Sequence, residues 1–330
     1  MAKAPQPELT IWAVSDGRAG IEAQAEGLAM AVARLRPATV ILKRIGWKAG
    51  LGRLPWWLNP FPRLALRAES SIAAPWPDVW IAAGRASLPL STRVRRWSGG
   101  QTFVVQTQNP RAPAAAFDLI VPPEHDGLAG PNVFPVLGAP NRLTADRLAA
   151  ELARFAPRLA DLPHPRVAVI VGGTSKAFDL PADHAAAMAA QVAAAVEAAG
   201  GSVMVSFTRR TPAAARAAIA GGLRPLPGWI WDERGDNPYI AFLAAADAIL
   251  VTEDSVNLTT DAAATGAPIY RLTLTGGSAK FARFHAELEA RGIARRFAGR
   301  LETWRYPPLF EADRAAADLL RRYDARKNII

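Results

Sequence analysis

Acidic and hydroxyl-bearing residues gather where an apolar run ends, in the stretch AILVTEDSVNLTTDAAATG over residues 248–266. Glu253, Asp254 and Ser255 follow the apolar run directly, and Asp261 comes two helical turns later. A serine at this place is a good N-cap, and a helix N-terminus attracts anions. The stretch therefore predicts a strand-to-helix corner that holds an anionic group.

Three more corners of this kind follow apolar runs in the second half of the chain: VGGTSKAF, FTRRTP and TGGSAKF. Consecutive glycines with small hydroxyl residues favour backbone amides that wrap a phosphate, and a pair of arginines can clamp a diphosphate. Neither a Walker loop nor a GxGxxG motif is present. The residues expected to hold phosphate are Gly172, Gly173, Thr174, Ser175, Lys176, Arg209, Arg210, Gly276 and Gly277.

Two candidates for proton transfer lie in the first half. SDGRAG places Asp16 and Arg18 where the first apolar run ends, and PPEHDG places His125 between two acids. Asp16 could act as a base or bind an acceptor, and His125 could act as a base. Both stretches also read as ordinary turns.

Short apolar runs alternate with alanine-rich helical stretches along the chain, a pattern typical of βα units around a parallel sheet. Strands are expected at 9–14, 39–42, 78–83, 102–107, 117–121, 166–173, 201–207, 228–231, 248–252 and 267–272. Helices are expected at 20–35, 144–159, 181–200 and 311–324. Ligands of such sheets bind at the carboxyl ends of the strands, so we expect the corners to line one cleft.

A proline-bearing stretch, ADLPHPR over residues 160–166, separates two rounds of this pattern. We therefore predict an α/β protein with two doubly wound, Rossmann-like domains that face each other across a cleft. The first covers residues 1–160 and the second 161–310, and a helix in 311–330 packs back on the first.

Positive charge is concentrated in the first half of the chain. Residues 1–160 carry 19 Lys and Arg against 11 Asp and Glu, whereas residues 161–330 carry 20 against 18. Between residues 27 and 68 eight basic residues, among them Arg53, Arg63 and Arg67, occur without an acid and are interleaved with tryptophans. This composition favours an anionic membrane surface or a lipid or glycolipid as partner. Nucleic acid is disfavoured, because no known nucleic-acid-binding motif appears.

Other classes are excluded or disfavoured by composition. The chain has no cysteine, so it has neither disulfides nor thiolate zinc sites, and its four histidines show no metal-ligand spacing. No apolar run is long enough to span a bilayer, and no secretory signal is apparent at the N-terminus. We expect a cytoplasmic protein, peripheral on the inner face of the cell membrane, with no bound metal.

Segments in order from about residue 10 to 310 resemble the bacterial members of the mitochondrial-fission, elongated-mitochondria family. They include SDGRAGIEAQAEGLA, PDVWIAAGR, FVVQTQNPR, FDLIVPPEHD, TRRTP and ATGAPIY. Plant members of this family are associated with mitochondrial division, in which they recruit a dynamin-like protein.

EDSVNLTTDAAATG is also similar to the donor-binding segment of GT-B glycosyltransferases such as the peptidoglycan lipid-intermediate N-acetylglucosaminyltransferase. Asp261 stands in the place of their ribose-binding acid, and Ser255 stands where they usually have glycine. GGTSK stands in the place of their diphosphate loop. The first domain of these enzymes binds the acceptor and docks on membrane.

This similarity implies a glycosyltransferase that takes a UDP-, GDP-, CMP- or ADP-sugar and transfers the sugar to a membrane-associated or cell-envelope acceptor. The second domain would hold the nucleotide-sugar, and Asp16 or His125 would take the proton of the acceptor. No tightly bound cofactor is implied. Two alternatives stay open: a non-enzymatic adaptor that keeps the fold and binds membrane or a protein partner, and an epimerase acting on nucleotide-sugars.

Overall fold

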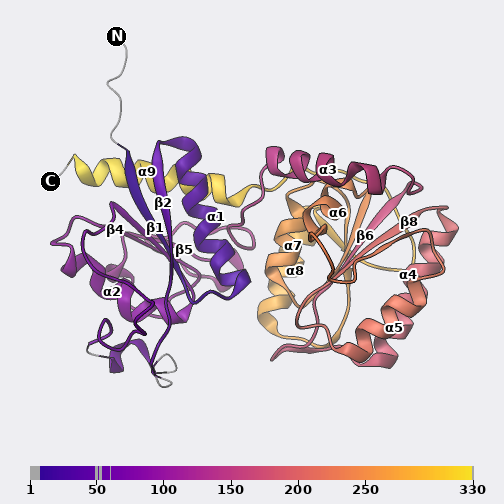
Figure 1. Ribbon diagram of the computed structural model, residues 1–330, viewed down its shortest axis with the longest axis horizontal. Helices are drawn as coiled ribbons and strands as arrows, with labels where there is room; N and C mark the ends of the chain where they lie inside the picture. Colours follow the sequence, from indigo (N-terminus) through magenta and orange to yellow (C-terminus); the bar gives the residue numbers. More distant parts are fainter. Residues whose placement is uncertain (1–7, 49–50, 52–53, 60, 329–330) are drawn as a thin grey trace, which may run out of the picture. The chain divides into compact units, whose positions relative to one another are not determined.

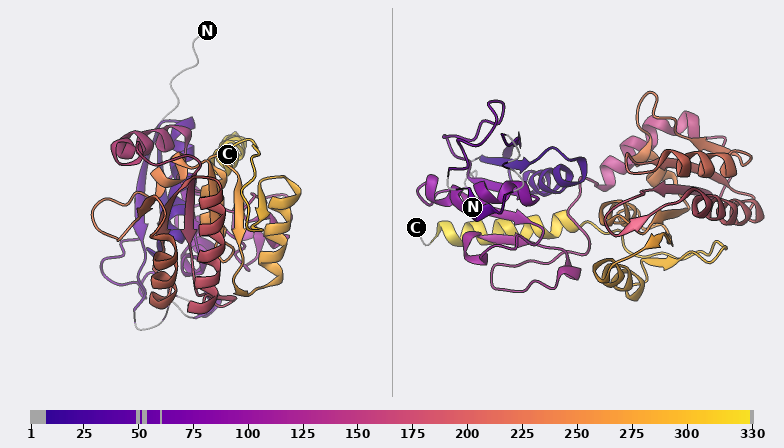
Figure 2. Two further views of the ribbon diagram at one scale, coloured as in Figure 1. Left: turned by 90° about the vertical axis from the view of Figure 1, so that its right-hand side faces the viewer. Right: turned by 90° about the horizontal axis from the view of Figure 1, so that it is seen from below.

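The computed structural model describes residues 8–48, 51, 54–59 and 61–328, so Arg53 of the basic segment lies outside the described residues. The chain divides into two compact units. Unit 1 comprises Met1–Arg142 and Phe310–Ile330, and unit 2 comprises Leu143–Leu309. In each unit helices lie on both faces of one parallel sheet (Figures 1 and 2).

The sheet of unit 1 has the strand order β2-β1-β3-β4-β5, with all pairs parallel. The inner strands are buried along nearly their whole length because helices cover both faces, whereas the edge strand β2 is largely exposed. The strands are β1 (Leu9–Ser15), β2 (Ala38–Arg44), β3 (Val79–Ala83), β4 (Phe103–Thr107) and β5 (Leu119–Val121).

The helices of unit 1 come from both ends of the chain. They are α1 (Ala19–Leu35), α2 (Leu88–Trp97) and α9 (Glu311–Lys327), with short 3-10 turns η2 (Trp56–Leu58), η3 (Arg85–Ser87), η4 (Ala114–Ala116) and η5 (Glu124–Asp126). The C-terminal helix α9 packs beside α1, where Ala315 and Leu319 join Leu28 and Val32 in one core (Figure 2). The backbone amide of Leu137 also donates to the buried Glu311 carboxylate, at 2.7 Å.

The main sheet of unit 2 is parallel, with the strand order β13-β11-β10-β6-β8-β9, and β12 and β7 form a separate two-stranded ribbon. The strands are β6 (Arg166–Val171), β7 (Phe178–Asp179), β8 (Ser202–Phe207), β9 (Gly228–Ile230), β10 (Ala248–Thr252), β11 (Ile269–Leu272), β12 (Thr275–Gly276) and β13 (Ala294–Arg296). The helices are α3 (Ala145–Leu159), α4 (Ala182–Ala198), α5 (Ala213–Leu223), α6 (Tyr239–Ala245), α7 (Val256–Ala263) and α8 (Ala279–Ala290).

The boundary between the units falls after Arg142, earlier than the proline-bearing stretch at 160–166 suggested. The physical reason is the packing of α3, which lies against α6 of unit 2. Phe155 of α3 contacts the ring of Trp229 at 5.8 Å between centroids, and the Arg158 guanidinium lies 3.6 Å from the centroid of the same ring. These contacts place α3 with the second unit.

In the part of the chain that the structure describes, none of the helices combines the length and the apolar character that a bilayer crossing requires.

Candidate functional site

Three of the four polar corners of the second half meet at one edge of the unit 2 sheet. Strands β10, β6 and β8 are parallel neighbours, so their carboxyl ends lie side by side. The turns that follow them are residues 253–255, 172–176 and 208–212. Within unit 2 these three turns therefore lie at one edge of the sheet.

The glycine turn after β6 is closed by acceptors of the protein itself. The amide of Gly172 donates to Thr252 Oγ1 at 2.7 Å, and that of Gly173 donates to Asp254 Oδ2 at 3.1 Å. The amides of Thr174 and Ser175 donate to backbone carbonyls at 3.1 and 2.8 Å. The sequence suggested amides open to a phosphate, but all four have an internal acceptor.

Asp254 explains this closure. Its side chain is fully buried, forms an ion pair with Arg210 Nη1 at 2.6 Å, and accepts from Thr252 Oγ1 at 2.7 Å. A β-carbon at Gly172 would lie 2.2 Å from the Asp254 carboxylate, so only glycine fits there. The carboxylate thus lies against Gly172 and accepts from the Gly173 amide, so a side chain of the protein itself fills this side of the turn.

Arg210 also shapes the turn through its backbone. A β-carbon at Gly173, whose φ is +149°, would lie 2.3 Å from the Arg210 carbonyl oxygen. Thr208 Oγ1 donates to the Gly172 carbonyl at 3.1 Å, and Thr211 Oγ1 donates to the Val171 carbonyl at 3.0 Å. Sequence reasoning selected the two arginines and missed the flanking threonines, although the pattern T-R-R-T carried the signal.

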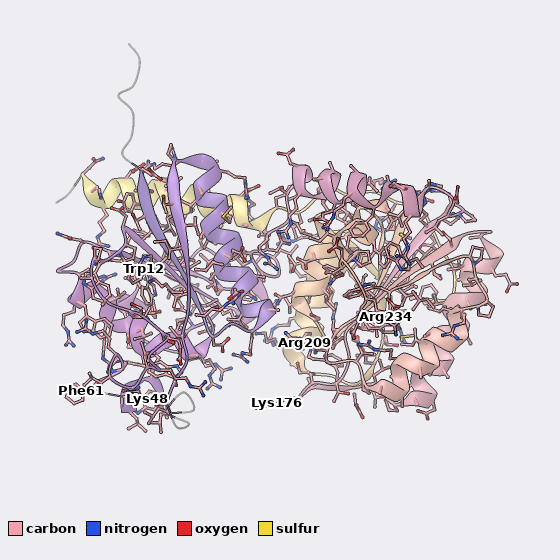
Figure 3. All side chains as sticks on the ribbon, viewed as in Figure 1. Trp12, Lys48, Phe61, Lys176, Arg209 and Arg234 are labelled. Atoms are coloured by element: carbon pink, nitrogen blue, oxygen red, sulfur yellow. The ribbon has the colours of Figure 1, made fainter. Side chains whose placement is uncertain are left out.

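Two cations of this edge have no partner in the part of the chain that the structure describes. Lys176 and Arg209 are exposed and, among the described residues, neither side chain forms a hydrogen bond or an ion pair. Figure 3 shows both on the lower side of unit 2. Arg209 lies just before α5, where a cation opposes the helix dipole unless an anion joins it. These two side chains are the groups of the edge that are available to an external anion.

Glu253 fastens neighbouring elements. Its Oε1 accepts from the Leu274 amide at 2.8 Å, and its Oε2 forms an ion pair with Arg271 Nη1 at 3.3 Å. Its carbonyl accepts from Nε2 of His285 at 2.9 Å. Burial lowers the pKa of His285 to about 4, so this histidine is neutral at pH 7. Glu253 therefore holds β11 and α8 in place.

Helix α7 begins as the sequence predicts. Ser255 Oγ caps it by accepting from the Leu258 amide at 3.4 Å. Asp261 lies two turns further and accepts from the Tyr239 hydroxyl at 3.0 Å. Burial, followed by the charge of Asp261, raises the pKa of Tyr239 well above its ordinary value. The side chain expected to bind ribose thus has a tyrosine partner.

The fourth corner is tied to the glycine turn by the small ribbon. In it Thr275 pairs with Asp179 and Gly276 with Phe178, and the Gly277 amide donates to the Ala177 carbonyl at 2.7 Å. A β-carbon at Gly276 would lie 2.4 Å from that carbonyl oxygen. Gly276 and Gly277 therefore allow close backbone approach, and they join the loop before α8 to the loop after β6.

A groove of about 410 Å³ runs along the flank of unit 2 between α5 and strands β8 and β9. Phe207, Ile230 and Trp231 supply apolar walls, and Arg216 lines it near the start of α5. Arg216 Nη2 donates to the Thr208 carbonyl at 3.4 Å, which places the groove next to the arginine turn. Sequence reasoning did not identify this groove.

The two candidate bases lie in unit 1 and are not neighbours. Asp16 follows β1 and binds Arg18 through Nε and Nη2, at 2.9 and 2.8 Å. His125 is buried in η5 after β5. Strands β3 and β4 separate β1 from β5, a spacing of about 14 Å across the sheet. Among the described residues no three His, Asp or Glu side chains gather in a manner that could hold a metal ion.

Comparison with solved structures identifies the fold. The UDP-GlcNAc 2-epimerase of Methanocaldococcus jannaschii matches with a TM-score of 0.54 and 11% identity, over 96% of this chain and 100% of that one. Os79 from O. sativa, solved in complex with UDP, matches with a TM-score of 0.51 and 12% identity, over 97% and 93%. The predicted class, two Rossmann-like α/β domains of the GT-B type, is confirmed.

Sequence comparison identifies the family. The mitochondrial fission protein ELM1 of Arabidopsis thaliana is 31% identical over 277 residues, which are 76% of this chain and 65% of that protein. The chain thus spans less than two-thirds of this relative. Protein RP120 of Rickettsia prowazekii (strain Madrid E) is 28% identical over 93% of this chain and 97% of its own. A family model described as "Mitochondrial fission ELM1" matches residues 19–323, and the chain belongs to that family.

Proposed function

We propose that this protein binds a nucleotide-sugar through unit 2 and transfers the sugar to a membrane-associated or cell-envelope acceptor. The observation that carries the proposal is the meeting of polar turns at one sheet edge, where Lys176 and Arg209 are exposed and unpartnered among the described residues. The fold supports it, because Os79, a protein of the same fold, forms a complex with UDP.

The chemistry requires stabilisation of the leaving group. When the bond between the anomeric carbon and the phosphate oxygen breaks, the nucleoside diphosphate gains negative charge. Lys176 and Arg209 supply two positive charges where that charge develops. Arg210 contributes less, since Asp254 already pairs with its guanidinium.

The nucleoside has a place beside these cations. The groove of about 410 Å³ is within the usual size of small-molecule sites, and its aromatic walls suit a base. In the proposed arrangement the base lies against Phe207 and Trp231, while the diphosphate lies at Lys176 and Arg209. Asp261 is the candidate for the ribose.

The acceptor hydroxyl loses a proton as its oxygen bonds to the anomeric carbon. Asp16 is the candidate base, and His125 is the alternative. Asp16 keeps contact with solvent, with 18% of its side chain exposed, whereas His125 is buried. A base must reach the acceptor hydroxyl, and Asp16 is more accessible to a substrate than His125.

Calorimetric titration with UDP-, GDP-, CMP- and ADP-sugars tests donor binding. The variant K176Q/R209Q should weaken binding about a hundredfold, because each lost charged contact to phosphate costs about tenfold in affinity. Arg305→Gln is the matched control: Arg305 is exposed and comes directly before the segment, residues 306–308, that packs on Gly266. No heat with any donor, from protein whose circular dichroism shows it folded, would reject the proposal. Product analysis with the donor that binds then separates transfer from epimerisation.

A second candidate is a non-enzymatic adaptor, and the closed glycine turn favours it. Asp254 fills the place of a phosphate at Gly172 and Gly173, so this turn does not need a nucleotide to be complete. The titration distinguishes the two functions. An adaptor binds no donor, yet it keeps the membrane binding described next.

Exposed apolar side chains support docking of unit 1 on an anionic membrane. All large apolar residues that are exposed in the described chain fall between residues 30 and 64, within the stretch that lacks acids. They are Met30, Leu35, Ile41, Leu42, Leu54, Trp57, Leu58, Phe61 and Leu64. Figure 3 shows Phe61 and Lys48 together at the lower end of unit 1. Apolar side chains beside cations are the composition that inserts among anionic headgroups.

Flotation with phosphatidylglycerol vesicles tests this docking. The variant W57S/F61S/L64S should lower the partition onto these vesicles at least tenfold, because each buried apolar side chain contributes roughly 1.5–3 kcal/mol. Pure phosphatidylcholine vesicles should bind the parent protein weakly. Equal flotation of parent and variant would contradict the proposal.

A further inference from the structure

Four of the five strands of unit 1 have an arginine as their last residue or in the loop that follows. Arg44 ends β2, Arg18 follows β1, Arg85 follows β3 and Arg111 follows β4. The strands are parallel, so these residues belong to one edge of the sheet. Arginines at or shortly after four strand ends make this edge favourable for an anion.

The four arginines differ in their partners. Arg18 pairs with Asp16 at 2.8 Å, and Arg44 pairs with Glu22 at 2.6 Å. The side chains of Arg85 and Arg111, by contrast, are exposed and form no hydrogen bond or ion pair within the described residues. These two follow adjacent strands, since Ala83 of β3 is in register with Thr107 of β4.

The loop that carries Arg111 is held in an unusual backbone conformation. Gln108 and Arg111 have φ angles of +67° and +49°, and only Glu233 shares this trait among the other described non-glycine residues. Gln108 Nε2 donates to Gln24 Oε1 at 3.0 Å, and the Arg111 amide donates to Asn109 Oδ1 at 3.0 Å. Positive φ is strained in non-glycine residues, and such residues are often found at binding sites.

The turn that carries Arg85 is joined to the segment that we assign to the membrane. Trp47 Nε1 donates to the Ala86 carbonyl at 3.2 Å. Lys48, the next residue, donates to the Leu64 carbonyl at 3.0 Å. The turn of Arg85 therefore contacts the segment of unit 1 that includes the exposed Leu64.

We propose that Arg85 and Arg111 form an anion site that binds the phosphate or diphosphate group of the acceptor. Guanidinium forks match phosphoryl oxygens in pairs, and two such forks in the loops after neighbouring strands, both without a partner among the described residues, suit a group with more than one negative charge. The identification of the ligand as the acceptor rests on the proposed function. The anion site itself does not.

Titration of the full chain with inorganic pyrophosphate tests the site. We expect two binding events, one at each unit. R85Q/R111Q should remove one event or weaken it about a hundredfold, and K176Q/R209Q should remove the other. Arg96→Gln is the control for unit 1, because Arg96 is exposed and unpartnered among the described residues but lies in the last turn of α2. The side chains changed in these variants are all exposed, so the variants should keep the melting temperature of the parent protein. They are Arg85, Arg96, Arg111, Lys176 and Arg209.

The two proposals fail separately. If R85Q/R111Q leaves pyrophosphate binding unchanged while K176Q/R209Q lowers it, the acceptor site is wrong and donor binding stands. If R85Q/R111Q lowers pyrophosphate binding and K176Q/R209Q does not, the anion site of unit 1 is supported and the donor site is rejected. Vesicles with phosphatidic acid then identify the source of the phosphate. Weaker flotation of R85Q/R111Q than of Arg96→Gln indicates a lipid-borne group, and equal flotation indicates a soluble one.

Discussion

The carboxyl edges of the two sheets carry similar residues but use them differently. In unit 2 the ion pair joins the fully buried Asp254 carboxylate to Arg210, whose side chain is 40% exposed. In unit 1 the ion pair of Asp16 and Arg18 stays at the surface, with 18% of the aspartate and 68% of the arginine side chain exposed. The same pair of residue types thus completes the fold in one unit and remains within reach of a ligand in the other.

Burial, and not residue type, therefore decides which polar corner is available to a ligand. A buried carboxylate must find partners in the protein, because its desolvation is costly. An exposed one can exchange its partner for a substrate at little cost. Four predictions test this contrast, in order of decreasing expected effect.

Asp254→Ala should have the largest effect. It leaves the Gly173 amide and the Arg210 guanidinium without their acceptor, and we expect unit 2 to lose about 3 kcal/mol of stability. Hydrogen exchange measured by mass spectrometry should show faster exchange in peptides from β6 and β10, with β1 and β3 unchanged. Asp254→Asn, which keeps the shape, should lose about half as much. Equal protection in parent and Asp254→Ala would contradict the structural role.

Gly173→Ala compares the glycines of the two edges. The new β-carbon would meet the Arg210 carbonyl at 2.3 Å, so the backbone must move, at a cost of roughly 2–3 kcal/mol. Gly17→Ala in unit 1 has a φ of +78° but meets only the Arg44 side chain at 3.6 Å, and should cost about 1 kcal/mol. Urea unfolding of both variants measures the difference. A larger loss of unfolding free energy in Gly17→Ala than in Gly173→Ala would contradict this prediction.

A pH dependence should reside in unit 2. The pKa of His285 is lowered to about 4 in the folded state, against 6.5 in an unfolded chain, so below pH 6.5 the unfolded state binds the proton first. Stability is therefore lost as pH falls from 6.5 towards 4, and unfolding at pH 5 should need about 2 kcal/mol less than at pH 8. His285→Gln should flatten the dependence of the unfolding free energy on pH. An unchanged dependence in this variant would show that another group is responsible.

Asp16→Asn should have the smallest effect on stability, below about 0.5 kcal/mol, because the pair with Arg18 is exposed. If Asp16 is the base, the same variant should lower the transfer rate by a hundredfold or more. Thermal melting and a radiolabel transfer assay measure the two effects. A large loss of stability in Asp16→Asn would show that Asp16, like Asp254, has a structural role. Full transfer activity in this variant would exclude Asp16 as the base.

Much of the fold could be predicted from the sequence because its strands are short apolar runs between helices. All ten expected strands are present. The short strands β7, β12 and β13 are not predicted, because their residues FD, TG and ARR form no apolar run. The boundary of unit 1 was placed too late because the prolines at 163 and 165 mark a turn, whereas the contacts of α3 with α6 decide its unit.

The candidate site was predicted as a set of turns but not in its internal pairing. Sequence order shows that Gly173, Arg210 and Asp254 each follow a strand. It does not show that the Asp254 carboxylate lies on the glycine turn, because this depends on the strand order β10-β6-β8. Sequence order also does not show that Arg85 and Arg111 lie in neighbouring loops, because this depends on the pairing of β3 with β4.

The return of α9 to unit 1 bears on how the chain is made. Ala315, Leu319 and Tyr323 belong to the same core as α1, yet the ribosome synthesises them after all of unit 2. The part of the unit 1 core that α9 covers therefore stays exposed until unit 2 has been synthesised. Translation that stops before residue 310 would release an intact second domain and a first domain that exposes this part of its core to chaperones and proteases.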